Sequence, residues 1–212
     1  MRITGFAAAM SAALTALEVI GFGEAPPSGI EILTGAGAIL GDDKRIRFPR
    51  ALVEDMLKKA ARGIKLHARD EKQDLHLEPS RVHYGTAGAA VYVVDSEKRE
   101  YRESTVQDLY DAGRIVDHLD NVHFYQRCMV CRDIPDNFEM DMNTLYACCA
   151  ATTKHVGVSF TSPDYIPHAL EMLHMIAGGE EQWRARPFVS NSNCFVVPPM
   201  KFAQEACQIM EQ

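Results

Sequence analysis

The chain has 212 residues, of which 47% are hydrophobic and 24% are charged, and these are ordinary values for a globular protein. Its formal net charge of −7 argues against nucleic-acid binding, because neutralising phosphates requires an excess of Lys and Arg. No apolar run approaches the ~20 residues of a membrane-spanning helix. Six cysteines are too sparse for a secreted disulfide scaffold, and Glu18 interrupts the Ala-rich run from Phe6 to Leu17. The composition therefore favours a cytoplasmic protein with reduced thiols.

Residues 1–80 lack a regular strand–helix rhythm. They are predicted to contain, in chain order, a helix over Phe6–Ile20, a short helix from Ile30, a strand over Arg45–Phe48, a helix over Pro49–Ala60 and edge strands within Ile64–Leu77. We interpret this part as an N-terminal helical extension with short strands.

Residues 81–212 contain four successive strand–helix units. The predicted strands are Arg81–Asp95 (interrupted by Gly85 and Gly88), Asn121–Val130, Lys154–Phe160 and Pro187–Phe195. The predicted helices are Ser104–His118, Phe138–Thr152, Asp164–Ala177 and Pro199–Met210. Such alternation indicates an α/β fold with a parallel sheet covered by helices. Four units are half of a (β/α)8 TIM-type barrel, so the sequence predicts the N-terminal half of one, with a β-hairpin in which Glu100–Arg102 is the return strand.

The predicted helices have recognisable ends and faces. Ser104 with Gln107 forms a predicted capping box, and Asp136 with Glu139 forms another. The inner face of the second long helix is predicted to comprise Phe138, Met142, Leu145, Tyr146 and Cys149.

Polar residues follow the predicted strands, where a parallel α/β barrel places its function. These residues are Gln126, Arg127 and Asp133 after the second strand, Thr161 after the third, and Asn191 and Asn193 after the fourth, with Tyr84 on the first. The polar run Ser190–Asn193 lies at the end of a buried strand, and its side chains need partners. A ligand is one alternative, and caps or neighbouring strands are the other.

Cys128 and Cys131 suggest a metal or redox pair. A zinc site needs further ligands, but the adjacent Cys148 and Cys149 diverge by ~100° on a helix and do not face one metal together. A redox pair should run directly into a helix, whereas residues 133–135 intervene. Buried structural cysteines are the favoured interpretation.

Taken together, these segments resemble the corrinoid-dependent trimethylamine methyltransferase superfamily, which includes relatives that act on glycine betaine. The resemblance extends from about Ala16 to the end and is carried by Ala36–Glu54, Val82–Asp95, Arg102–Leu109, Asp133–Pro135, Thr153–His155 and Arg186–Ser190. It implies a TIM-type barrel of which this chain is the N-terminal half. It also implies transfer of a methyl group from a methylated amine to the cobalt of a corrinoid on a separate protein. Reduced cobalt is then the nucleophile, in agreement with the absence of a recognisable catalytic triad.

The resemblance implies a cage for a methylated ammonium ion, made of aromatic faces and oxygens. The candidate substrate-binding residues are Tyr84, Gln126, Arg127, Asp133, Thr161, Asn191 and Asn193, and no catalytic residue or bound metal is assigned. The expected partners are a corrinoid protein and a small methylated amine.

A half-barrel leaves sheet edges unpaired, so we expect a homo-oligomer or completion by the other half. Two alternatives stay open at this stage. One is a truncated or split family member with a scaffolding role that is inactive alone, and the other is a zinc- or thiol-dependent protein that uses Cys128 and Cys131.

Overall fold

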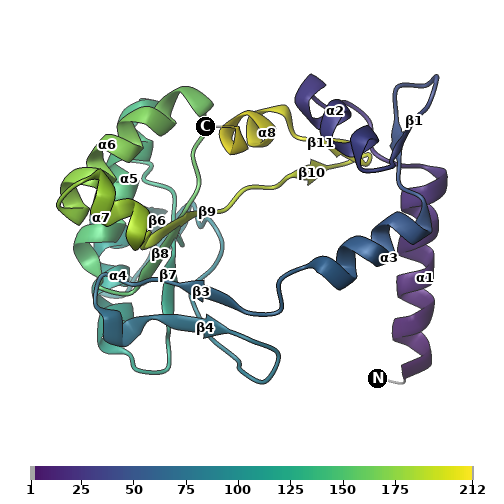
Figure 1. Cartoon of the computed structure of the whole chain (residues 1–212). Coiled ribbons are helices and arrows are strands. Elements are labelled where there is room, and N and C mark those ends of the chain that lie inside the picture. Colours follow the sequence, from purple (N-terminus) through teal and green to yellow (C-terminus); the bar gives the residue numbers. More distant parts are fainter. Residues whose placement is uncertain (1–2, 212) are drawn as a thin grey trace. The chain divides into compact units, whose positions relative to one another are not determined.

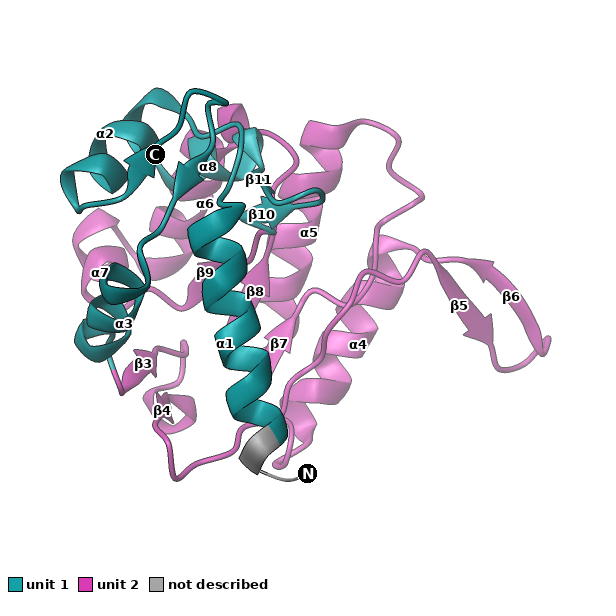
Figure 2. Ribbon diagram, turned by 90° about the vertical axis from the view of Figure 1, so that its right-hand side faces the viewer, with its two compact units in different colours: residues 1–61, 194–211 teal, residues 62–193, 212 magenta. Residues whose placement is uncertain are grey.

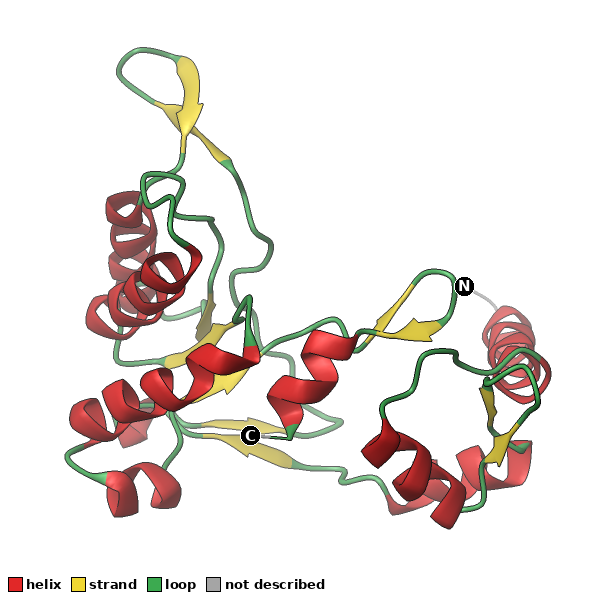
Figure 3. Ribbon diagram, turned by 90° about the horizontal axis from the view of Figure 1, so that it is seen from above, coloured by secondary structure: helices red, strands yellow, loops and turns green. Residues whose placement is uncertain are grey.

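The computed structural model describes residues 3–211. Internal contacts group the chain into two compact units, one made of the described residues up to 61 with 194–211, and one made of residues 62–193 (Figure 2). Helices alternate with small sheets throughout, which makes the fold a mixed α/β one (Figure 3). No described helix is both long and apolar enough to cross a membrane.

The first unit combines both ends of the chain. Its elements are α1 (Ile3–Val19), α2 (Pro27–Gly35), β1 (Ile39–Leu40), β2 (Ile46–Arg47), α3 (Arg50–Lys59), β10 (Val196–Val197), β11 (Lys201–Phe202) and α8 (Gln204–Met210). The ring of Phe22 packs against that of Phe202 with centroids 5.5 Å apart. Arg45 donates hydrogen bonds to the main-chain oxygens of Gly21 and Met200, each over 2.8 Å, and so ties the two chain segments together.

The second unit contains the main sheet. Its elements are β3 (Ile64–Leu66), β4 (Leu75–Leu77), β5 (Tyr92–Asp95), β6 (Glu100–Glu103), α4 (Val106–His118), β7 (Phe124–Gln126), α5 (Asn137–Ala151), β8 (His155–Val158), α6 (Ile166–Ala177), α7 (Glu180–Ala185) and β9 (Val189–Asn191), with 3-10 turns at Glu71–Gln73 and Pro163–Tyr165. Strands β7, β8 and β9 form a parallel sheet in that order, while β3–β4 and β5–β6 are antiparallel hairpins. The predicted return strand is therefore confirmed as β6.

Helices α4–α7 lie to one side of this sheet (Figure 1). Alternate strand residues, among them Tyr125, Val156 and Val158, are almost fully buried against Leu109 and Leu145 of the helices. Burying one such side chain contributes about 1.5–3 kcal/mol. Because side chains alternate along a strand, the residues between them face away from the helices.

The first predicted strand, Arg81–Asp95, is interrupted at Gly88 as predicted, but Gly85 pairs with the sheet instead of interrupting the strand. Only Gly85 and Ala90 form parallel bridges, to Phe124 and Met129, before the chain enters β5. Between them Gly88 adopts a φ of 99°, which breaks the extended conformation. The first segment thus lies beside β7 but pairs at two points rather than along its length.

The last predicted helix, Pro199–Met210, also begins too early. Lys201 and Phe202 instead pair with β10 as β11, and α8 starts at Gln204. Met200 has a φ of 58°, so the chain turns back on itself where the prediction placed the first helical turn. A proline such as Pro199 suits the first position of a helix, but pairing with β10 places the following residues in a strand instead.

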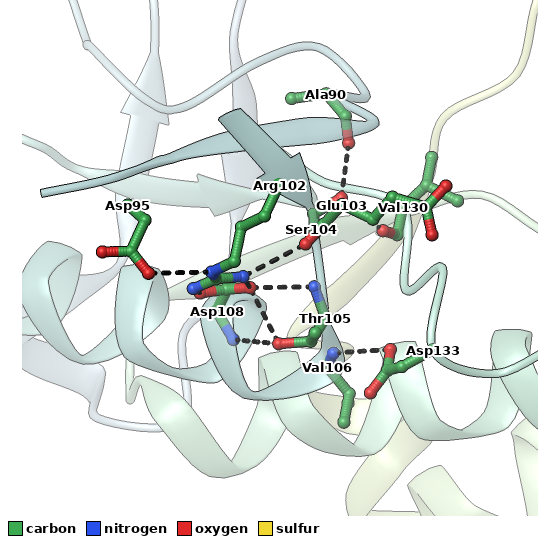
Figure 4. Close-up of polar contacts among 10 residues, drawn as sticks. All are labelled: Ala90, Asp95, Arg102, Glu103, Ser104, Thr105, Val106, Asp108, Val130 and Asp133. Atoms are coloured by element: carbon green, nitrogen blue, oxygen red, sulfur yellow. Dashed lines mark hydrogen bonds and ion pairs between the residues drawn. The ribbon is translucent and has the colours of Figure 1, made fainter. Parts of the chain in front are cut away.

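The cap predicted at Ser104 and Gln107 lies one residue further along. Thr105 is the N-cap of α4 and forms the capping box with Asp108, whose carboxylate also binds Arg102 through two bonds of 2.6 Å (Figure 4). The Ser104 hydroxyl instead donates to the main-chain oxygen of Val130 over 2.8 Å. The second predicted capping box is confirmed only as an N-cap, because the Asp136 carboxylate accepts the Glu139 amide over 2.9 Å, while no reciprocal bond from the Asp136 amide to the Glu139 side chain is found among the described residues.

The prediction of which residues form the inner face of α5 was only partly correct. Met142, Leu145 and Cys149 are buried, but Tyr146 is 60% exposed, and Phe138 lies at the rim, where it packs edge-on against Tyr165. The buried stripe is wider than predicted and also includes Asp141, Thr144, Ala147, Cys148 and Ala151. A polar residue such as Asp141 was not expected there from periodicity alone.

Candidate functional site

Three residues lie side by side across the sheet on the face turned away from the helices. Gln126 of β7 is in register with Gly157 of β8, and Gly157 is in register with Ser190 of β9. In the same strands Tyr125, Val156 and Val189 pack towards the helices, so the alternate residues face the other way. We call Gln126, Gly157 and Ser190 the polar row.

Gly157 allows the Gln126 side chain to lie across the sheet. A Cβ atom on Gly157 would be only 1.9 Å from Gln126 Oε1, so a larger residue displaces the amide. The main-chain oxygen of Gln126 accepts a hydrogen bond of 2.5 Å from the Thr86 hydroxyl. The position of the Gln126 side-chain amide therefore depends on Gly157 in the neighbouring strand.

Ser190 is hydrogen-bonded to a buried histidine. Its Oγ lies 3.0 Å from His155 Nε2, and His155 Nδ1 lies 2.7 Å from the main-chain oxygen of His67. A carbonyl only accepts hydrogen bonds, so Nδ1 must carry a proton. Burial lowers the pKa of His155, in part offset by the His67 carbonyl. The neutral imidazole therefore accepts the Ser190 proton at Nε2.

Phe124 lies one layer below the polar row on the same face. It is in register with His155 on β8, and its ring lies over Gly85, where a Cβ atom would come within 2.3 Å. Phe124, Gln126 and Ser190 each keep part of their surface accessible. The face thus combines one aromatic ring with the oxygens of an amide and a hydroxyl.

A charged cluster beside His155 is centred on Asp74, whose side chain is 8% exposed. Its carboxylate accepts the Ala68 amide over 2.8 Å and binds Lys65 and Arg186, each over 2.9 Å. Burial acts to raise the pKa of Asp74, but the amide and the two cations outweigh it and the net pKa is strongly lowered. His67 Nδ1 lies 3.3 Å from the same carboxylate.

Arg127 lies at the carboxyl end of β7. Its guanidinium donates to the Ser159 hydroxyl over 2.8 Å, and its buried Nε has no hydrogen-bond partner within the described part of the chain. Nearby, the Thr161 hydroxyl and amide bind the carboxylate of Asp141 over 2.9 and 2.7 Å. Burial raises the pKa of Asp141, opposed by its bonds to Thr161.

The structure brings together some of the predicted site residues and separates others. Gln126 ends β7 and Asn191 ends β9, the two outer strands of the sheet, with β8 between them, and Arg127 follows Gln126. Asn191 is in register with Val158, which packs towards the helices, so it does not share the face of the polar row. Tyr84 precedes the bridge at Gly85, which places it at the opposite, amino end.

Asp133, Thr161 and Asn193 lie apart from the polar row. Asp133 accepts the Val106 amide over 3.0 Å and so caps α4 (Figure 4), and Thr161 is bound to Asp141. Asn193 is exposed two residues beyond β9. These contacts give Asp133 and Thr161 structural partners.

Cys128 and Cys131 do not form a metal centre with other side chains of residues 3–211, where no group of three or more His, Cys, Asp and Glu is arranged to hold an ion. Cys131 is fully buried, with its sulfur 3.4 Å from the Thr144 hydroxyl. Burial raises the pKa of the Cys131 thiol, which disfavours the reactive thiolate. The geometry gives no support to the zinc or thiol alternative.

Sequence reasoning missed Phe124, Gly157 and His155 as members of this face. A usable signal was present, because a histidine beside valines in a buried strand requires a polar partner. The partner itself, Ser190, lies 35 residues away and is brought near only by strand pairing.

A family model described as "Trimethylamine methyltransferase (MTTB)" matches residues 4–212. The chain belongs to this family. It is 27% identical over 198 residues to the trimethylamine methyltransferase MttB of Desulfitobacterium hafniense, a match that covers 93% of this chain and 40% of the relative. It is 24% identical over 169 residues to MttB1 of Methanosarcina mazei, with 78% and 34% covered.

The match therefore spans only 40% and 34% of the length of these two relatives. Family membership rests on a match along nearly the whole chain, whereas the activity of the longer relatives is not carried over by that match alone.

Proposed function

We propose that this chain forms the N-terminal half of a methyltransferase that moves a methyl group from a methylated amine to the cobalt of a corrinoid on a separate protein. The observation that supports it is the face formed by Phe124, Gln126 and Ser190, which offers a ring and oxygens to a ligand. Methylated ammonium ions are bound by aromatic faces and by oxygen atoms that contact their partly positive methyl groups. The substrate is trimethylamine or a quaternary amine such as glycine betaine.

The work of this chain is to bind and orient the ammonium ion. Reduced cobalt supplies the nucleophile, so no side chain needs to attack the methyl group. The amide of Gln126 and the hydroxyl of Ser190 contact the methyl groups beside the positive nitrogen, and Phe124 closes the face from below.

The parallel order of the sheet supports a barrel origin. The segment 85–90, β7, β8 and β9 lie in chain order, as the first strands of a TIM-type barrel do. Among the described residues, β9 has no further partner on its outer edge. Further strands, from a second copy of this chain or from the rest of a longer family protein, complete the barrel and shield that edge.

Transfer to free cob(I)alamin tests the proposal. The chain is incubated with trimethylamine or glycine betaine, and formation of methylcobalamin is followed by its absorbance, with light scattering to give the mass of the active species. Methylation that requires a discrete oligomer supports completion of the barrel by a second copy. A monodisperse, folded chain that neither binds nor demethylates either amine overturns the proposal and favours a scaffolding role.

A further inference from the structure

We propose that His155 sets the direction of the Ser190 hydroxyl, so that Ser190 presents only lone pairs to a methylammonium cation and loses this ability when His155 is protonated. His155 is then a positioning residue, and Ser190 is the group that touches the ligand. The inference rests on the proposed function for the identity of the cation, and it adds a residue-level device that controls binding at the polar row.

When the His155 imidazole is neutral, its hydrogen bonds to His67 and Ser190 allow only one arrangement of protons. The His67 carbonyl accepts from Nδ1 over 2.7 Å, which leaves Nε2 with a lone pair 3.0 Å from Ser190 Oγ. Ser190 must donate its single proton to Nε2. Among the described residues no other hydrogen bond reaches Ser190 Oγ, so both of its lone pairs remain available, on a side chain that is only partly buried.

Such an oxygen suits a cation that has no N–H group of its own. The methyl hydrogens of a quaternary ammonium carry part of the positive charge and contact oxygen lone pairs and ring faces. The Gln126 carbonyl oxygen, held across Gly157, lies in the same row, and Phe124 lies in the layer below. The three groups provide negative potential without a formal charge.

Protonation of His155 reverses the arrangement. An imidazolium donates from both nitrogens, so Nε2 donates to Ser190 and the hydroxyl proton turns towards the ligand. A positive hydroxyl proton and a positive ring then both oppose a methylammonium ion. Because the neutral form is favoured by burial, this change belongs to the acid side of the ordinary histidine range.

The charged groups around His155 are few and identifiable. Asp74 favours the imidazolium and the His67 ring opposes it, while Lys65 and Arg186 neutralise Asp74 through 2.9 Å ion pairs. His67 is the other imidazole near this site. Its main-chain oxygen, not its ring, makes the bond to His155, so the two histidines are separable by substitution.

The experiment is a binding titration of the full 212-residue chain with tetramethylammonium, whose charge does not change with pH. Affinity is measured by ligand-observed NMR or calorimetry between pH 5 and 8, and the His155 imidazole is titrated by its own proton shifts. We expect affinity to fall about tenfold from pH 8 to pH 5, along the His155 titration curve.

His155→Gln provides the decisive variant. Its amide can donate to the His67 carbonyl and accept from Ser190, yet it does not titrate, so binding should persist at pH 5. His67→Ala keeps the main-chain oxygen and should retain the acid loss. Ser190→Ala should reduce affinity about tenfold at pH 8 and change it little at pH 5, where the hydroxyl no longer favours the cation, whereas the exposed Ser96→Ala should not alter it at any pH.

The outcomes separate this inference from the proposed function. Binding of equal strength at pH 5 and 8 in the unmodified chain, or an acid loss that disappears in His67→Ala, overturns the role of His155 while the proposed function stands. No binding at any pH overturns both. A fall in affinity that follows His155 and is absent from His155→Gln supports the inference, and the titration of the unmodified chain decides the matter if that variant does not fold.

Discussion

The ammonium group of Lys154 donates a hydrogen bond to the main-chain oxygen of Leu119 over 2.8 Å, just beyond the end of α4. It also donates to the oxygens of Val116 and Val122, each over 2.7 Å, and Lys154 is only 2% exposed. The last carbonyls of a helix have no intrahelical partner, so a buried cation satisfies groups that water does not reach. Lys154 thereby joins the end of α4 to the start of β8.

We predict that Lys154→Met lowers the free energy of unfolding by about 3 kcal/mol, because three main-chain carbonyls, one buried and two part-buried, lose a charged donor. Urea denaturation followed by circular dichroism measures the change. The matched control is Lys59→Met on the surface of α3, where the pair with Asp55 is exposed and screened by solvent, so its loss should change stability little. Equal stability of the two variants would show that the carbonyls are satisfied without Lys154.

Asp74 should make the fold sensitive to acid. Its folded pKa lies below the ordinary 3.8, so its stabilising contribution is fully present above that value and is lost as pH falls through the folded pKa. We expect Asp74→Asn to cost about 2 kcal/mol at pH 7 and to flatten the decline in stability below about pH 5. Thermal unfolding from pH 3 to 7 provides the measurement, with the exposed Asp42→Asn as the control. A parallel decline in both variants would assign the acid sensitivity to other groups.

The thiols should divide into accessible and protected classes. Cys194 is exposed and Cys128 is half-buried, whereas burial raises the pKa of Cys149 to about 12 and also raises that of Cys148. A neutral, buried thiol reacts slowly with disulfide reagents. We predict rapid labelling of Cys194, slower labelling of Cys128 and protection of the others until the protein unfolds, with mass spectrometry to locate the label. Rapid modification of Cys131, or stoichiometric zinc in the purified protein, would restore the thiol or zinc alternative.

Helices were more predictable than strands in this chain. α4, α5 and α6 begin and end within two residues of their predicted bounds, because helix periodicity and caps are local signals. Strand lengths depend on partners elsewhere in the chain, and the predicted Asn121–Val130 shrank to Phe124–Gln126. The predicted division at residue 80 stays a prediction, since contact grouping alone does not define a domain.

The candidate site was predictable only in part for the same reason. Gln126 was found because it is a polar residue that was assigned to the functional end of a predicted strand. His155 and Gly157 became relevant only when strand pairing placed them opposite Phe124 and Ser190, and a shift of register by one residue would have turned them towards the helices. The space that Gly157 leaves for Gln126 arises from the pairing of β7 with β8, so neither sequence segment predicts it alone.

Gly157→Ala tests that dependence directly. The added Cβ would meet Gln126 Oε1 at 1.9 Å and Cδ at 2.8 Å, so the amide must move away from the polar row. The obstructing atoms are the end of a flexible side chain, and we therefore expect a stability change within about 1 kcal/mol but about a tenfold loss of tetramethylammonium affinity.

The control for this substitution is Gly35→Ala at the end of α2, where an added Cβ meets nothing within 4 Å. It should leave affinity as it is and change stability by less than about 1 kcal/mol. Gln126→Ala should reduce affinity as Gly157→Ala does, and the double variant should be no worse than either alone, because both remove the same oxygen from the row. Additive losses would mean that Gly157 contributes to binding by a route independent of Gln126, and an unchanged affinity in Gly157→Ala would remove Gln126 from the ligand face altogether.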